Sequence, residues 1–278
     1  MRKSFGLAAL MLVATAAAPA AEPGMTVLKT PGGVRFGLWG EKPRKPAPTL
    51  FVFAAGLEDM QKEPYYTEVG RILARRGFLY VALDAPSHGG DVKPGEPGGL
   101  RGWRHRLETG DALVPPFTKR ATEVLDYLIK EGYSDGERVA ACGTSRGGFL
   151  AYHFAAADAR VRAVAGFSPV TNLLALSEFA GMDKHEATKA LSLIHHADKL
   201  AGRAVWLIIG NDDQRVSTDD AIAFTRKVTA ASAAKAKGRA QSIPVELIVG
   251  AAVGHTTPAK AHELAADWIA RQLGVPEK

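Results

Sequence analysis

Short apolar runs alternate along the chain with longer segments whose apolar residues recur every three or four positions. Thr49–Ala55 (TLFVFAA) is a continuous apolar run rich in β-forming residues, which is typical of a strand buried on both faces of a parallel sheet. A helical pattern follows it, and the alternation continues to the C-terminus. Repeated strand–helix units predict an α/β fold, with a mostly parallel central sheet and helices on both faces. The predicted strands are residues 26–30, 34–40, 49–55, 78–84, 138–143, 161–167, 204–210 and 243–250, and the predicted helices are residues 65–76, 118–130, 146 onward, 219–234 and 258–273.

Two segments interrupt the alternation. Residues 86–116 are rich in Gly and Pro and long for a simple connection, which indicates a functional loop or a surface insertion. Residues 171–200 have helical spacing, with Leu173, Leu174, Leu176 and Phe179 on one face, so we expect a small helical cap over a pocket. No internal repeat or linker divides the chain, so residues 22–278 are expected to form a single domain.

The N-terminus has the layout of a secretory signal peptide. Arg2 and Lys3 precede an apolar run from Phe5 to Ala18, and small residues follow it. The alternative is a membrane anchor, but the apolar run is shorter than the ~20 residues that span a bilayer. Residues 1–21 are therefore expected to be removed near Ala21, and the mature protein to be periplasmic or secreted.

Charge and cysteine content narrow the range of functions. The formal charge is +6, and it falls to +4 when Arg2 and Lys3 are removed with the signal peptide. The basic residues are scattered, so nucleic-acid binding is not indicated. Cys142 is the only cysteine, which excludes an internal disulfide, and no His-Glu-x-x-His or comparable ligand cluster is present. We expect no metal and no cofactor, and the oligomeric state stays open.

A glycine-rich turn joins a predicted strand to a predicted helix. Gly143-Thr144-Ser145-Arg146-Gly147 is a G-x-S-x-G motif in the context that such a nucleophile turn needs. Glycines are required because the tight turn would bring larger side chains into collision. The turn lifts the Ser145 hydroxyl off the end of the sheet, and the N–H groups that open the next helix can stabilise an oxyanion.

A serine hydroxyl is a poor nucleophile without a base, and the base needs an acid to orient it. Asp212 and Asp213 follow one buried strand, and His255 follows the next strand along the chain. The order Ser, Asp, His, each just past a strand end, is that of α/β hydrolases.

The chain resembles the α/β hydrolases, and within them the dienelactone-hydrolase and prolyl-oligopeptidase-like serine esterases, from about Thr49 to the last helix. FVFAAGLE is similar to the segment that supplies the oxyanion hole, and LDAPSHGG to an Asp-x-Pro-x-His-Gly turn. GNDDQRV is similar to the acid loop, and its spacing selects Asp213 as the acid. The resemblance implies that the Leu57 and Arg146 amides are oxyanion donors. Ala55 stands where many relatives have histidine, but the donors are backbone groups.

Two further side chains, those of Arg146 and Trp103, are candidates for contact with the substrate. The Arg146 side chain could contact an acyl or carboxylate group of the substrate, or pair with an acid on the rim. Trp103 lies in the 86–116 loop, where such loops overhang the site, and is assigned a substrate contact. Arg104 and Arg106 are close to it, and ion pairs are the favoured interpretation for both.

The remaining histidines have structural interpretations. His88 lies in the Pro-Ser-His-Gly turn, where a hydrogen-bonding role is expected. His153 lies two turns into the helix after Ser145 and is expected to be packed, and His195 and His196 to be exposed on the predicted cap.

These features predict a secreted serine hydrolase that cleaves small or medium carboxylic esters through an acyl-enzyme on Ser145, with His255 as base and Asp213 as acid. One alternative is a peptidase of the prolyl-oligopeptidase kind. It would have to be a small member, because too few residues precede the third strand for the β-propeller that the large members carry. A second alternative is an inactive hydrolase fold used for binding. Dehalogenase and epoxide hydrolase chemistry is disfavoured, because those relatives use aspartate at the nucleophile position.

Overall fold

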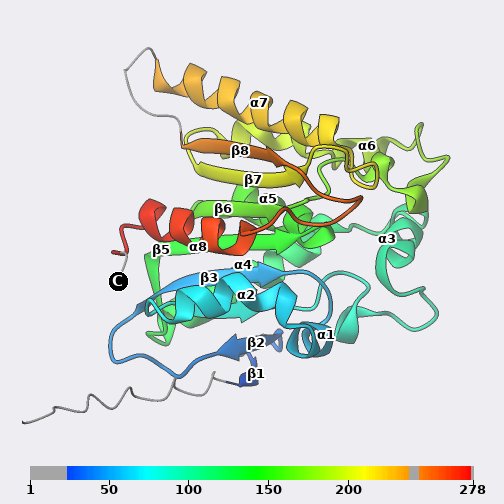
Figure 1. Cartoon of the computed structure of the whole chain (residues 1–278). Helices are drawn as coiled ribbons and strands as arrows, with labels where there is room; N and C mark the ends of the chain where they lie inside the picture. Colours follow the sequence, from blue (N-terminus) through cyan, green and yellow to red (C-terminus); the bar gives the residue numbers. More distant parts are fainter. Residues whose placement is uncertain (1–23, 238–243, 277–278) are drawn as a thin grey trace, which may run out of the picture.

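Eight strands form one mixed sheet in the computed structural model, which describes residues 24–237 and 244–276 (Figure 1). The order is β1-β2-β4-β3-β5-β6-β7-β8, with β1, β2 and β4 paired antiparallel and all pairs from β4 to β8 parallel. The strands are β1 (Met25–Lys29), β2 (Arg35–Trp39), β3 (Ala47–Phe53), β4 (Leu79–Ala82), β5 (Ser134–Thr144), β6 (Val161–Phe167), β7 (Ala204–Gly210) and β8 (Val245–Gly250). The predicted α/β fold and its mostly parallel sheet are confirmed.

Helices cover both faces of the sheet. One face packs against α1 (Leu57–Lys62), α2 (Pro64–Ala74) and α8 (Ala261–Gln272). The other face packs against α3 (Gly99–Glu108), α4 (Val114–Lys130), α5 (Arg146–Ala157) and α7 (Thr218–Ala236). Figure 1 shows α2 and α8 in front of the sheet and α7 beside β7 and β8.

The central strands are buried on both faces, which is why their sequences read as unbroken apolar runs. Every residue of β3 and of β7 is buried. Two layers of side chains result, one against each set of helices. Because the parallel strands share a direction, their carboxyl ends lie along one edge, and the loops that leave them can meet there.

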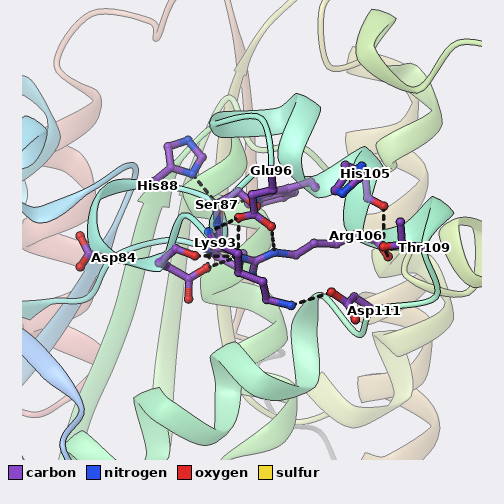
Figure 2. Close-up of polar contacts among 12 residues, drawn as sticks. Asp84, Ser87, His88, Lys93, Glu96, His105, Arg106, Thr109 and Asp111 are labelled. Carbon is purple, nitrogen blue, oxygen red and sulfur yellow. Dashed lines mark hydrogen bonds and ion pairs between the residues drawn. The ribbon is translucent and has the colours of Figure 1, made fainter.

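The predicted loop at residues 86–116 is an ordered insertion that contains α3. Arg106 is buried and donates to both carboxylate oxygens of Glu96, at 2.7 and 2.9 Å (Figure 2). It also pairs with Asp91 at 2.8 Å. A second, exposed ion pair joins Lys93 to Asp111 at 2.6 Å. These contacts fix the Gly- and Pro-rich stretches on either side of α3.

The segment 171–200 differs from its prediction. Instead of an amphipathic helix it forms short 3₁₀ turns at residues 173–175, 177–179 and 193–200, with one short helix, α6 (Glu186–Ala190). Leu173, Leu176 and Phe179 are nevertheless buried against the core. This spacing is compatible with 3₁₀ turns as well as with an α-helix, because both conformations place residues three positions apart on the same face.

The described residues contain no helix that is long and apolar enough to cross a membrane. The signal peptide predicted at residues 1–21 lies outside the described residues.

Candidate active site

Ser145 stands at a strained turn between β5 and α5. Its backbone has φ 53° and ψ −117°, a region that non-glycine residues rarely adopt. The turn is fixed by hydrogen bonds from Ser145 N–H to the Phe167 carbonyl (2.9 Å) and from Val170 N–H to the Ser145 carbonyl (3.0 Å). Neighbouring loops thus hold the serine in a conformation that its own backbone disfavours.

The flanking glycines make this turn possible. A Cβ on Gly147 would overlap the Phe53 carbonyl at the end of β3, and a Cβ on Gly143 would overlap the backbone of Gly147. Both overlaps involve backbone atoms, which cannot rotate away. The G-x-S-x-G spacing is therefore a packing requirement of the turn.

His255 links the serine to a buried carboxylate. The His255 Nε2 atom lies 3.0 Å from the Ser145 Oγ, and its Nδ1 atom lies 2.8 Å from the Asp213 Oδ2. The Asp213 side chain is fully buried, whereas the imidazole is 28% exposed. This geometry favours the tautomer in which Nδ1–H donates to Asp213 and Nε2 accepts the serine proton.

The Asp213 loop orients its carboxylate from the other side. Oδ1 of Asp213 accepts from the Arg215 and Val216 amides at 3.0 and 3.2 Å, which leaves Oδ2 for His255. Asp212 instead accepts a hydrogen bond from the Gln214 side chain and does not reach His255. The structure thus brings together Ser145, Asp213 and His255 from the ends of β5, β7 and β8, and places Asp213 rather than Asp212 against His255.

The loop that carries His255 is held close to the serine. The Ser168 Oγ donates to the Thr256 carbonyl at 3.3 Å, and the Tyr65 hydroxyl is hydrogen-bonded to the Thr257 hydroxyl. Burial raises the pKa of Tyr65 above its ordinary value. Contacts from two other elements therefore position a loop that is itself largely exposed.

Of the two predicted oxyanion donors, the structure offers one. Arg146 is the first residue of α5, so its N–H has no acceptor within the helix and lies next to Ser145. The Leu57 N–H instead donates to the buried Asp84 Oδ1 at 2.8 Å. This contact contradicts the prediction for Leu57, because an amide engaged by a carboxylate does not point at the reacting carbonyl. Burial raises the pKa of Asp84, and the Leu57 N–H opposes that shift.

A cavity of about 430 Å³ opens beside the serine. Its aromatic and apolar walls come from Ala54, Tyr65, Tyr66 and Leu100. The other lining residues are polar or cationic: Thr144, Ser145, Arg146, Ser168, Arg215, His255, Thr256 and Thr257. The segment 171–200 contributes no lining residue among those described, although its Glu178 pairs with Arg215 at 2.6 Å.

Trp103 does not contact this cavity, which corrects its predicted role. The side chain is completely buried, its Nε1 donates to the Pro86 carbonyl at 2.5 Å, and its ring packs on Phe149. The helix α3 turns the indole inward and makes it part of the core. Arg104 and Arg106 form ion pairs, as favoured from the sequence, but Arg106 is buried.

The other histidines lie in structural environments. His88 contacts the Pro86 carbonyl through Nδ1 at 2.8 Å, and burial, followed by the nearby Arg146, lowers its pKa. His153 is packed between Phe149 and His196, and burial lowers its pKa to about 3, so it is neutral.

Several cavity residues were missed by sequence reasoning. Tyr65 and Tyr66 open α2, where nothing in the sequence distinguishes them from other helix residues. Arg215 lies within GNDDQRV, so the acid motif did carry a signal for it.

Comparisons with solved structures agree with this architecture. A cold-adapted esterase from an Arctic intertidal metagenomic library is 18% identical with a TM-score of 0.61, over 89% of this chain and 92% of that one. Dipeptidyl peptidase 4 of Porphyromonas gingivalis is 15% identical with a TM-score of 0.68, over 91% of this chain and 35% of that one. A glucuronoyl esterase from Solibacter usitatus is 16% identical with a TM-score of 0.59, over 92% of this chain and 88% of that one. At these identities the likeness shows a common fold.

No curated protein matches the sequence. The model of the prolyl oligopeptidase family does match, over residues 68–275, which is most of the chain and includes the serine, aspartate and histidine described above. The chain therefore belongs to the prolyl oligopeptidase family of serine hydrolases.

Proposed function

We propose that this protein is a serine esterase that hydrolyses small or medium carboxylic esters through an acyl-enzyme on Ser145. The observation that carries the proposal is the hydrogen-bonded series Ser145–His255–Asp213, which ends in a cavity of about 430 Å³. Each member comes from a different strand end and is fixed by further contacts.

The chemistry follows from the geometry. The Ser145 Oγ attacks the acyl carbon while His255 Nε2 takes its proton, and Asp213 stabilises the imidazolium that forms. The Arg146 N–H donates to the tetrahedral oxyanion. The imidazolium then protonates the leaving alcohol, and a water activated by His255 releases the acid. The proposed steps use only side chains and backbone groups of this chain and water.

The charge of the cavity favours esters over peptides that are recognised by a free amino terminus. Among the described residues its lining includes two arginines and no aspartate or glutamate. A protonated amine would be repelled by this charge, whereas a neutral or anionic ester would not. A small peptidase is the second candidate, because the family match and the likeness to a dipeptidyl peptidase favour it.

Rate measurements separate these candidates. We expect the purified protein to hydrolyse p-nitrophenyl acetate or butyrate, and Ser145→Ala to lower turnover by about 10⁶-fold while the fold is retained. Release of p-nitroaniline from Ala-Pro-p-nitroanilide, with no ester hydrolysis, would support the peptidase. No turnover of either substrate by folded protein would support the binding-protein alternative.

We also propose that the protein is exported. The support is the N-terminal sequence, with Arg2 and Lys3 ahead of an apolar run and small residues. N-terminal sequencing of protein from the periplasm or medium should begin near Ala21, and full-length protein retained in the cytosol would contradict export.

A further inference from the structure

The cavity beside Ser145 is lined by the guanidinium group of Arg146, which has no partner among the described residues. Arg215 is neutralised by Glu178 at 2.6 Å and also donates to the Ser177 hydroxyl at 3.0 Å. The Arg146 Nε is buried and makes no hydrogen bond, and within residues 24–237 and 244–276 its side chain forms no ion pair. The cavity therefore has one uncompensated positive charge.

The Arg146 side chain is partly exposed, but its Nε is shielded from water, whereas the buried Arg106 is fully paired. Arg106 is bound by both Glu96 and Asp91. The buried Nε–H of Arg146 has lost its contact with water, and no acceptor in the described residues replaces it. Arg146 is also the first residue of the 12-residue helix α5, so its charge adds to the positive end of the helix dipole. Both effects would be offset by an anion bound in the cavity.

We propose that the acyl group of the substrate bears a second, ionised carboxylate, which binds the Arg146 side chain. The substrate class is then the hemiester of a short dicarboxylic acid. This inference rests on the proposed esterase function and adds the identity of the acid.

Geometry limits where that carboxylate lies. Adjacent Cα atoms are about 3.8 Å apart, so Arg146 and the nucleophile reach into the same cavity from neighbouring positions. Because both side chains line one cavity of about 430 Å³, the proposed acyl chain between the carboxylate and the scissile carbonyl is short. A planar guanidinium can hold it through two parallel N–H···O bonds, while Tyr66 and Leu100 contact the carbon chain.

The test compares two esters that differ only in charge. Monoethyl glutarate is the anionic substrate, and ethyl 5-methylhexanoate, with an isopropyl group in place of the carboxylate, is its neutral counterpart. The measured quantity is the ratio of their kcat/KM values in a pH-stat near neutral pH, so a general loss of catalysis cancels. We expect this ratio to exceed about 10 in the wild type, since hydrogen bonds to charged groups contribute that much or more.

Three variants test whether the Arg146 side chain causes the preference for the anionic ester. Arg146→Gln should lower the ratio by about 10- to 100-fold. Arg146→Lys should lower it by less, because lysine keeps the positive charge but cannot donate two parallel hydrogen bonds from a planar group. Arg162→Gln is the matched control: it removes the same charge from an exposed position on β6, where Arg162 pairs with Glu137. The control should leave the ratio unchanged.

The outcomes distinguish the inference from the function on which it rests. Equal hydrolysis of both esters, or a ratio unaffected by Arg146→Gln, would overturn the inference and leave the esterase standing. An equal fall in Arg162→Gln would also overturn it, because the preference would then come from overall charge. If folded wild-type protein hydrolyses neither these esters nor p-nitrophenyl esters, the proposed function fails and the inference fails with it.

Discussion

Glu96 in the 86–116 loop should be worth far more to stability than Asp111 in the same loop. Both carboxylates pair with a cation, as Figure 2 shows. The Glu96 side chain is only 3% exposed and binds the buried Arg106, whereas the Lys93 and Asp111 side chains are each about half exposed. The substitutions Glu96→Gln and Asp111→Asn remove one charge each and change the shape little.

The size of the Glu96 effect follows from its pKa. The hydrogen bonds from Arg106 lower it from an ordinary value of 4.5 to about 2. At about 1.36 kcal/mol per pH unit, this corresponds to roughly 3 kcal/mol of unfolding free energy near neutral pH. That is the lower end of the cost of breaking a buried ion pair, as expected when Asp91 still binds Arg106.

The pH dependence has a definite sign. Because the folded-state pKa is depressed, the stabilisation is fully present above pH 4.5 and is lost as the pH falls toward 2. The difference between wild type and Glu96→Gln should therefore shrink to roughly 40% of its neutral value by about pH 3.

Urea unfolding followed by tryptophan fluorescence measures both effects. We expect a loss of roughly 3 kcal/mol for Glu96→Gln near pH 7, and little change for Asp111→Asn, because exposed ion pairs contribute little. Equal losses in the two variants, or a Glu96→Gln difference that does not shrink in acid, would refute the assignment of the stabilisation to the buried pair.

Three other predictions concern the site and its support. Asp213→Asn should lower esterase turnover by about 10⁴-fold at unchanged stability, because the amide cannot hold the His255 tautomer, and near-normal kcat would contradict that role. Gly147→Ala should lower the melting temperature and abolish activity, because the new Cβ overlaps the Phe53 carbonyl; a stable, active variant would show that the turn can relax. Cys142 is buried, and burial raises the pKa of its thiol, so a disulfide reagent should modify it only on unfolding. Rapid modification under native conditions would contradict that burial.

The features that the sequence predicted well are those set by local pattern. The apolar run of β7 and the strand–turn–helix around Ser145 are each contained in a few consecutive residues. Asp213 and His255 could be placed because parallel strands end at the same edge of the sheet. These inferences need only strand ends, with no knowledge of side-chain packing.

The features that were missed depend on contacts between distant segments. The Leu57 N–H donates a hydrogen bond to Asp84, 27 residues later, and no motif around Leu57 indicates that acceptor. The inward turn of Trp103 depends on the Pro86 carbonyl and on Phe149 in α5. The pairing of Arg215 with Glu178, which leaves Arg146 alone in the cavity, likewise depends on how two loops meet.

If Ser145 is an activated nucleophile, a fluorophosphonate probe should label it in the folded protein. Intact mass and peptide mapping should find one adduct, on Ser145, in the wild type. Labelling should be absent in Ser145→Ala and strongly slowed in His255→Ala, since the base is then lost. A folded wild-type protein that takes no label, or an adduct that persists in Ser145→Ala, would show that Ser145 is not the activated nucleophile.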